Sequence, residues 1–436
     1  MQRQTTAESS EKVELSYRAF IGKLAKWVVL GCLIGLIVGT TSAVLLKTIK
    51  YLTDQREAHP FLLYLLPIGG VFIGYMYKSY GKDVEKGNNI VFENINAKGK
   101  VPLFMGPIVF LGTFLTHLFG GSTGREGAAI QMGGSIAEAF NRLFNIDQID
   151  QRILLMAGVA GGFGSAFGTP LSGTIFGMEV AAAGKMRYEG LLPCITASFV
   201  GHYVTTAWGA PHDHFKITEV PEIALLSMLK VILVSIAFSF VSVFYCKLRH
   251  GVQKYSTQYL VTPMLRGFVG GILIIALAHL LDTRDYTGRG LKIVEQAFTG
   301  EVAPFAFLAK LVFTAITMGF GFVGGEAIPL FFVGATLGNT LSSIIDMPTS
   351  FLAAIGFISV FCGAANTPIS CFLLGLEMFE GKALVYFFVA CVVSYIFSGP
   401  NGVWPSQRIY EPKSRMLNFP KGETIDALSK RRKAQK

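Results

Sequence analysis

Two charged residues stand between glycines in the stretch GREGAAIQ, residues Gly124–Gln131, at the start of an apolar run. Glycines followed by apolar residues predict the N-terminus of a helix, where free backbone N–H groups and the helix dipole present positive charge. Such a helix end can hold an anion without a full positive charge, so the anion can also leave. The stretch therefore predicts a broken helix with an anion site in front of it.

The composition of the chain places this broken helix in a membrane. Of 436 residues, 51% are hydrophobic and only 15% are charged, whereas a soluble domain has about 25% charged residues. The mean hydropathy is +0.50, and apolar runs near the length of a membrane span recur between Trp27 and Phe397. We therefore expect an all-α polytopic membrane protein. Broken backbone inside it must be buried in protein or line a cavity.

Basic residues gather at the two ends of the chain. The net charge is +10, and residues 408–436 hold nine Lys and Arg against three acids. By the positive-inside rule, this pattern predicts a multi-pass protein of the cell membrane with both termini cytoplasmic. Contact between the tails and anionic lipid explains the charge, so we expect no nucleic-acid partner.

The polar segment Ala210–Pro221 divides the apolar body near its middle. We expect a cytoplasmic N-terminal tail at 1–16, a first membrane repeat at 17–209, a linker at 210–222, a second membrane repeat at 223–407 and a basic cytoplasmic C-terminal tail at 408–436. His212, Asp213 and His214 lie in the linker, but two His and one Asp in a loop are more often solvated than bound to a metal. The six cysteines form no CxxC motif and lie in or beside apolar runs, which predicts buried thiols. We therefore expect no metal and no other cofactor.

An internal repeat underlies this division. The segments Thr169–Glu179 and Thr367–Glu377 both begin with Thr-Pro-x-Ser and place a Glu nine positions after the Pro, at an offset of 198 residues. Gly324–Glu326 likewise repeats the first break. A repeat of half the chain, with broken helices at matching positions, is typical of secondary transporters whose site lies at the repeat interface. Close helix packing explains the small residues of the repeat but not its paired glutamates.

Glu126 is the residue to which we assign the chemistry. A carboxylate inside a span costs about 2.5 kcal/mol or more on insertion scales, so its presence indicates a function. An ionised Glu126 can occupy the anion site itself, whereas a protonated Glu126 is neutral and vacates the site, which couples a proton to an anion. The alternative is a residue at a helix start that pairs with Arg125 at an interface.

Two further breaks carry polar groups. Glu326 precedes an apolar run with Pro329 in the predicted first helical turn, so this break has the same physics as the first. Asn88 and Asn89 bring amide donors to the end of an apolar region, where they can hydrogen-bond an anion. An Asn-Asn pair is also an ordinary turn signal, and that alternative stays open.

Three motifs resemble those of the CLC family of chloride channels and anion/proton antiporters. GREGAAIQMGGSI (Gly124–Ile136) resembles the gating-glutamate motif, GGEAIPLFFVGATLG (Gly324–Gly338) the second anion-binding motif, and GAANTPISCFLLGLE (Gly363–Glu377) the segment after it. The resemblance extends from about Leu24 to Ile409. It implies a CLC-type fold of two inverted repeats whose broken helices meet at a central anion site, in a homodimer with one pathway per subunit.

Within that family, the chain is most similar to the fluoride/proton antiporter branch. Gly87–Val91 stands where chloride members carry a Ser-containing loop, and Glu326 matches a Glu of this branch. Val180 stands where chloride/proton exchangers have a proton-relay Glu. The resemblance implies that Glu126 and Glu326 perform gating and proton coupling.

The resemblance also implies sets of residues for anion binding and for selectivity. The anion-binding set is Asn88, Gly124, Arg125, Gly127, Ala327, Ile328 and Trp404, and the selectivity set is Asn88, Asn89 and Phe92. Trp404 replaces the family's central tyrosine, and its indole N–H donates a hydrogen bond but cannot accept one. Ile328 replaces a threonine of the branch and lacks the hydroxyl.

These features predict an anion transporter rather than an enzyme, with no catalytic residues. We expect fluoride/proton antiport that exports fluoride, with fluoride or chloride, protons and the lipid bilayer as partners. The alternative is a chloride channel or chloride/proton exchanger of the same family. A membrane-embedded enzyme is a remote alternative, because His117, His202 and His279 are scattered and show no HExxH spacing.

Overall fold

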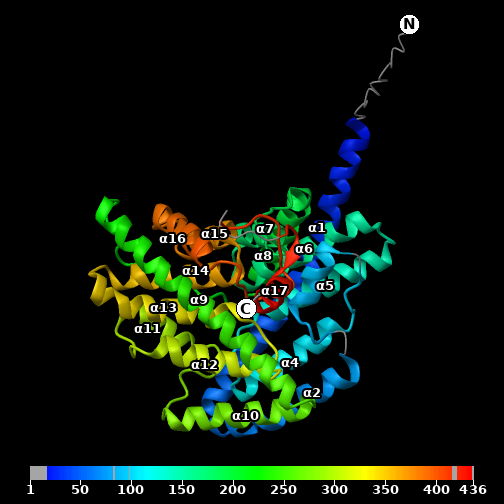
Figure 1. Ribbon diagram of the computed structural model, residues 1–436. Coiled ribbons are helices and arrows are strands. Elements are labelled where there is room, and N and C mark those ends of the chain that lie inside the picture. Colours follow the sequence, from blue (N-terminus) through cyan, green and yellow to red (C-terminus); the bar gives the residue numbers. More distant parts are fainter. Residues whose placement is uncertain (1–16, 82–83, 98, 415–419, 435–436) are drawn as a thin grey trace.

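The computed structural model describes residues 17–81, 84–97, 99–414 and 420–434 (Figure 1). The expected N-terminal tail at 1–16 lies outside the described residues. The described chain is mostly helical, which confirms the all-α expectation. The first half contains α1 (Tyr17–Ala58), η1 (Pro60–Leu65), α2 (Leu66–Tyr80), α3 (Asn88–Asn96), α4 (Met105–Phe119), α5 (Glu126–Leu143), α6 (Gln148–Phe167), α7 (Pro170–Glu179), η2 (Tyr188–Gly190) and α8 (Leu191–Ala207).

The second half repeats this order of helices after the linker 210–224, which has neither helix nor strand. Helices α12, α13 and α14 begin 201 residues after α4, α5 and α6, respectively. This half contains α9 (Leu225–Tyr259), α10 (Pro263–Leu280), α11 (Leu291–Thr299), α12 (Ala306–Gly319), α13 (Ala327–Ile345), α14 (Thr349–Ala365), α15 (Pro368–Met378) and α16 (Leu384–Phe397).

Five described helical segments are long and apolar enough to cross a membrane. They are Phe20–Ala58, Pro60–Tyr80, Leu225–Tyr259, Pro263–Leu280 and Ala327–Ile345. The second and fourth of these pack together across the two halves and lie at the bottom of Figure 1 as α2 and α10. Shorter apolar helices such as α4 and α12 fill the body between them, as expected where helices are broken inside a membrane protein.

Glycine and proline cause the breaks in the apolar runs. The run Leu154–Ala183 is divided by Gly168, whose φ of +75° ends α6 in the left-handed conformation, and by Pro170, which begins α7. Asn366, with φ +58°, and Pro368 divide α14 from α15 in the same way.

The paired glutamates of the repeat cap each other's helices. The Glu179 carboxylate accepts hydrogen bonds from the N–H groups of Ile369 and Ser370 at the start of α15, at 3.2 and 2.9 Å. The Glu377 carboxylate accepts from the N–H groups of Leu171 and Ser172 at the start of α7, both at 2.8 Å. Each half of the repeat thus supplies the cap for the matching helix of the other half. It gives the paired glutamates a structural role that the sequence pattern did not reveal.

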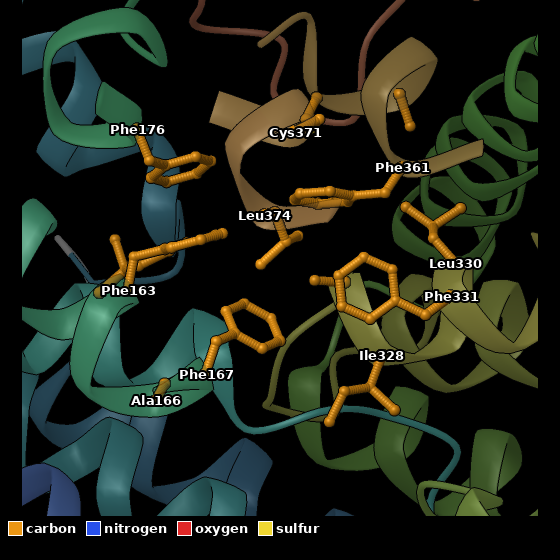
Figure 2. Close-up of a cluster of buried hydrophobic side chains, with 14 of the residues drawn as sticks. Phe163, Ala166, Phe167, Phe176, Ile328, Leu330, Phe331, Phe361, Cys371 and Leu374 are labelled. Carbon is orange, nitrogen blue, oxygen red and sulfur yellow. The ribbon is translucent and has the colours of Figure 1, made fainter. Parts of the chain in front are cut away.

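A cluster of phenylalanines forms the core between the halves (Figure 2). Phe163 of α6 stacks on Phe176 of α7 with ring centroids 4.0 Å apart. Phe331 of α13 lies edge-on to Phe361 of α14 at 5.1 Å, and Phe167 joins the two sides through Phe331 at 5.4 Å. All six cysteines are free thiols, and five of them are buried.

The segment after α16 folds back onto the body. Strand β2 (Arg408–Ile409) pairs in parallel with β1 (Ala182–Ala183) and antiparallel with β3 (Glu423–Thr424), and α17 (Ile425–Ala434) follows. The buried Gln407 amide donates to the carbonyl oxygens of Val180 and Ala365 at 2.7 and 3.0 Å. This segment therefore ties the ends of α7 and α14 together.

Candidate functional site

The two broken helices α5 and α13 begin beside a pair of bridged glycines. Gly124 and Gly325 form an antiparallel bridge in which each N–H donates to the other residue's carbonyl at 2.7 Å. The Thr123 hydroxyl adds a hydrogen bond to the Gly325 carbonyl at 2.8 Å. The bridge confirms that the sequence breaks are helix N-termini and brings both helix starts to one place. Two positive helix ends thus lie next to each other.

The Glu126 side chain folds back over the start of its own helix. It is 1% exposed, and its Oε1 accepts a hydrogen bond from the Arg125 backbone N–H at 3.2 Å. Its Oε2 lies against the bridge, since a Cβ on Gly124 or Gly325 would come within 2.4 or 2.6 Å of that oxygen. Oε2 has no hydrogen-bond partner in the described chain. The carboxylate thus occupies the region where an incoming anion would meet the helix N-terminus.

The Arg125 guanidinium forms its hydrogen bonds with the linker and not with Glu126. Its Nη2 donates to Asp213 Oδ2 at 3.1 Å and to the Pro211 carbonyl at 3.2 Å, both in the linker. The alternative in which Glu126 forms an ion pair with Arg125 at an interface is therefore not what the structure shows. Only the backbone of Arg125 contacts the carboxylate.

Glu326 stands immediately before α13 and has a partner. Its Oε1 accepts a hydrogen bond from Arg249 Nε of α9 at 2.9 Å, and both side chains are nearly buried. Arg249 also donates to the Gln253 side-chain oxygen. Sequence reasoning missed Arg249, because the apolar run that predicted this span stops at Tyr245 whereas α9 continues to Tyr259. The available signal was Arg249 itself, a charged residue soon after a long apolar run.

Asn88 lines a cavity of about 500 Å³ together with Gly324, Glu326, Arg249 and Trp404. It is the first residue of α3 and follows Gly87, whose φ is +56°, so the turn interpretation holds for the backbone. The amide nevertheless faces the start of α5, because a Cβ on Gly127 would lie 3.2 Å from Asn88 Nδ2.

Two side-chain oxygens of this cavity lack partners. Asn88 Oδ1 and Gln131 Oε1 are both buried without a hydrogen bond in the described chain. Gln131 lies one turn into α5 and faces Gly87, and the sequence analysis did not single it out. The available signal was an amide side chain five residues after Glu126, within the same motif.

Asn89 differs from Asn88 because its amide is used structurally. Its Oδ1 accepts hydrogen bonds from the Ser406 N–H and hydroxyl at 3.1 and 2.8 Å, and its Nδ2 donates to the Lys86 carbonyl. These bonds fix the segment that carries Trp404. Phe92 lies edge-on to the Trp404 indole with ring centroids 5.2 Å apart, and both are buried.

Ala327 and Ile328 form the first turn of α13 and are buried. Ile328 does not line the Asn88 cavity. It lines a second cavity of about 10 Å³, which Arg125 and Asp213 also line. Of the predicted anion-binding residues, Asn88 and Trp404 line the first cavity and Arg125 and Ile328 line the second, whereas Gly124, Gly127 and Ala327 line neither.

The Arg125–Asp213 pair that lines the second cavity is joined by another arginine outside the cavity lining. Arg289, in the loop before α11, lies 3.5 Å from Asp213 Oδ2, so two guanidinium groups share one carboxylate. Burial, reinforced by Arg125, lowers the pKa of Arg289 to about 10, so this side chain stays protonated at neutral pH. Neighbouring His212 donates from Nε2 to the Ser165 carbonyl at 3.0 Å. Among the described residues, no three His, Cys, Asp or Glu side chains are grouped to hold a metal.

Comparison with known proteins now identifies the family. The family model described as voltage gated chloride channel matches residues 69–399. The chain belongs to this family, the CLC family. It is 40% identical over 397 residues to a chloride/fluoride channel protein of Pseudomonas syringae pv. tomato. That match covers 89% of this chain and 88% of the relative. It is 25% identical over 301 residues to the H(+)/Cl(-) exchange transporter ClcA of Vibrio parahaemolyticus, with coverage of 64% and 63%.

Solved CLC structures agree with this assignment. The crystal structure of a CLC-type fluoride/proton antiporter matches with a TM-score of 0.86 and 31% identity, over 89% of this chain and 99% of that one. A slow cyanobacterial Cl-/H+ antiporter matches with a TM-score of 0.75 at 20% identity, over 94% and 98%, which concerns the fold alone. The predicted resemblance and the CLC fold are confirmed, and the chain is a multi-pass membrane protein.

Proposed function

We propose that this CLC protein exports fluoride in exchange for protons, and that Glu126 is the group that couples the two. The observation that carries the proposal is the position of the Glu126 carboxylate, folded over the N-terminus of α5 against the Gly124–Gly325 bridge. An ionised carboxylate there competes with an anion for the same N–H groups. When the Glu126 carboxylate takes a proton, it becomes neutral. The N-terminus of α5 then has no negative charge beside it, and a free anion can bind there.

Fluoride suits the donors that the two cavities offer. It is a small and strong hydrogen-bond acceptor, and the Asn88 amide and the backbone N–H groups around Gly127 and Ala327 are donors. The similarity at 40% to a protein named as a chloride/fluoride channel supports the same choice. In this proposal Asn88 selects the anion, Asn89 and Phe92 position the Trp404 segment, and Glu326 assists coupling.

The proposal includes an orientation and an assembly. The basic segment after residue 408 is cytoplasmic, so the Asn88 cavity, which Thr424 and Asp426 also line, is the cytoplasmic entrance for the anion. The linker at 210–222 and Asp213 then lie toward the other side of Glu126. By its family membership, we propose a homodimer in the lipid bilayer with one pathway per subunit, and transport rather than catalysis as its activity.

The experiment is a paired flux measurement in proteoliposomes that contain the full chain. Vesicles loaded with fluoride or with chloride are diluted into anion-free medium while anion release and external pH are recorded. We expect fluoride release to exceed chloride release by tenfold or more and to drive proton uptake. Equal rates for the two anions would replace the fluoride assignment with chloride transport.

The coupling role is tested with Glu126→Gln, which keeps the shape of the side chain but cannot carry a proton or a charge. We expect proton movement driven by the fluoride gradient to fall to the level of empty vesicles. Glu295→Gln, on the exposed surface of α11, serves as the matched control and should behave like the wild type. Proton coupling that survives in Glu126→Gln would refute the role of this residue.

A further inference from the structure

The residues Arg125, Asp213 and Arg289 form a buried charge cluster that anion binding at Glu126 does not explain. The Arg125 and Arg289 side chains are 2% and 9% exposed, and both contact one oxygen of Asp213, at 3.1 and 3.5 Å. Asp213 is more accessible, at 26%. Two full positive charges thus face a single carboxylate inside the protein, where charges are normally paired.

The donors of this cluster are incompletely used. A guanidinium has five N–H donors. Arg125 Nε and Nη1 and Arg289 Nε are buried and have no hydrogen-bond partner within the described chain. Buried donors without partners are rare in folded proteins and call for an acceptor. The acceptor that fits two guanidinium groups with spare donors is an anion.

A cavity of suitable size is lined by two members of the cluster, Arg125 and Asp213. Its volume of about 10 Å³ is close to the smallest that holds one water molecule. A fluoride ion is about as large as a water molecule. Figure 2 shows Phe167, Ile328 and Phe331, which close the cavity on the apolar side. The cavity shares no lining residue with the Asn88 cavity, so the two are separate.

The charge balance of this region depends on Glu126. Arg125 and Arg289 both interact electrostatically with Glu126 as well as with Asp213. Arg56 adds a further positive charge near Arg289. Loss of the Glu126 charge therefore raises the net positive charge of this region by one, and one monovalent anion offsets that change.

We propose that Arg125 and Arg289 form a binding site for a small monovalent anion that is separate from the Asn88 cavity, and that Asp213 is the tethered carboxylate that occupies its donors when no anion is bound. The inference rests on the proposed function, because the anion reaches this site past Glu126. Asp213 is the most exposed member of the cluster and belongs to a linker without helix or strand, so its side chain is the one that solvent can reach.

The test is calorimetric titration of sodium fluoride into the purified full-length protein, in a Glu126→Gln background that keeps residue 126 neutral. Adding Arg289→Gln should weaken fluoride binding at one site by about tenfold or more, the effect of losing one charged hydrogen-bond donor. Adding Asp213→Asn should tighten binding by about threefold, because the competing carboxylate is gone. Arg284→Gln removes an exposed charge from the same loop and should change nothing.

Unchanged fluoride binding in both the Arg289 and the Asp213 variants would overturn the site. If Arg289→Gln does not fold, Arg289→Lys keeps the charge but lacks the spare donors, and its binding should still weaken. The rise in melting temperature on adding fluoride gives a second readout of the same affinities. Failure of the proposed function is distinct, because it would appear as wild-type vesicles that release fluoride without proton uptake.

Discussion

At the scale of single residues, the two carboxylates of the site differ in what holds them. Each carboxylate has one oxygen without a hydrogen-bond partner in the described chain, but the other oxygen of Glu126 accepts from a neutral backbone N–H, whereas that of Glu326 accepts from the charged Arg249 guanidinium. A carboxylate with few bonds costs little to move, and one in a buried ion pair costs more. Glu126 is therefore suited to leave and re-enter its place, and Glu326 to stay.

The Arg249–Glu326 pair leads to a stability prediction. Arg249→Gln leaves the Glu326 carboxylate nearly buried without its counter-charge, and we expect the free energy of unfolding to fall by about 3 kcal/mol. The double variant Arg249→Gln/Glu326→Gln removes both charges and should recover most of that loss. Thermal unfolding in detergent measures both. A double variant no more stable than Arg249→Gln would show that the pair is not the cause.

The residues of the site could be predicted only where the sequence itself makes them unusual. Glu126, Glu326 and Asn88 stand out because polar groups beside glycines interrupt apolar runs. Arg249 and Arg289 belong to the site through their partners Glu326 and Asp213, which are 77 and 76 residues away in the sequence. Only tertiary packing brings these pairs together. A single sequence carries no signal for such pairings.

At the scale of helices, the reciprocal caps of α7 and α15 make the two halves depend on each other. Each capping carboxylate satisfies two N–H groups of a helix in the opposite half. Such groups have no partner within their own helix. Neither helix start is thus satisfied unless both halves are folded.

The reciprocal hydrogen bonds predict matched effects for the two caps. Glu179→Ala and Glu377→Ala should each lower the free energy of unfolding by about 1–2 kcal/mol, because each leaves two helix N–H groups without an acceptor. Glu301→Ala, at an exposed position before α12, is the control and should be neutral. Melting temperatures in detergent compare the three. A large effect from only one of the caps would contradict the symmetry.

Helix breaks were predictable, and helix lengths were not. Gly168 and Pro170 end and begin helices for local reasons, namely a left-handed backbone and a missing N–H. In contrast, α9 extends fourteen residues beyond the apolar run that ends at Tyr245. Its last turns are kept helical by packing of Ser256 and the residues around it against Gly319, which the local sequence does not encode.

At the scale of the whole molecule, the linker 210–224 joins the halves and also supplies Asp213 to the buried charge cluster. His212 fixes this linker through its hydrogen bond to Ser165 of α6. The sequence predicted the division into halves because the segment is polar. It did not predict that the linker is held inside the protein, because the residues that form hydrogen bonds with it belong to other segments of the chain.

The linker predicts a dependence of stability on pH. Burial lowers the pKa of His212 below its ordinary 6.5. Between the folded and unfolded pKa values the unfolded chain binds more protons, so stability is present above about 6.5 and falls as pH drops. We expect His212→Gln to lose less melting temperature than the wild type between pH 7.5 and 5.5. His214→Gln, at an exposed position, should keep the wild-type loss, and equal losses in all three proteins would exclude His212 as the cause.

The glycine bridge also has a consequence for the order of events during synthesis. Gly124 and Gly325 are 201 residues apart, and a ribosome adds about 5–20 residues per second. Glu126 is therefore synthesised about 10–40 s before Gly325, the bridge partner of Gly124. Throughout that interval the first half holds the Glu126 carboxyl group without the Gly325 backbone that lies against it in the folded protein. Nascent chains stalled before residue 325 should be the form of this protein most exposed to quality-control proteases.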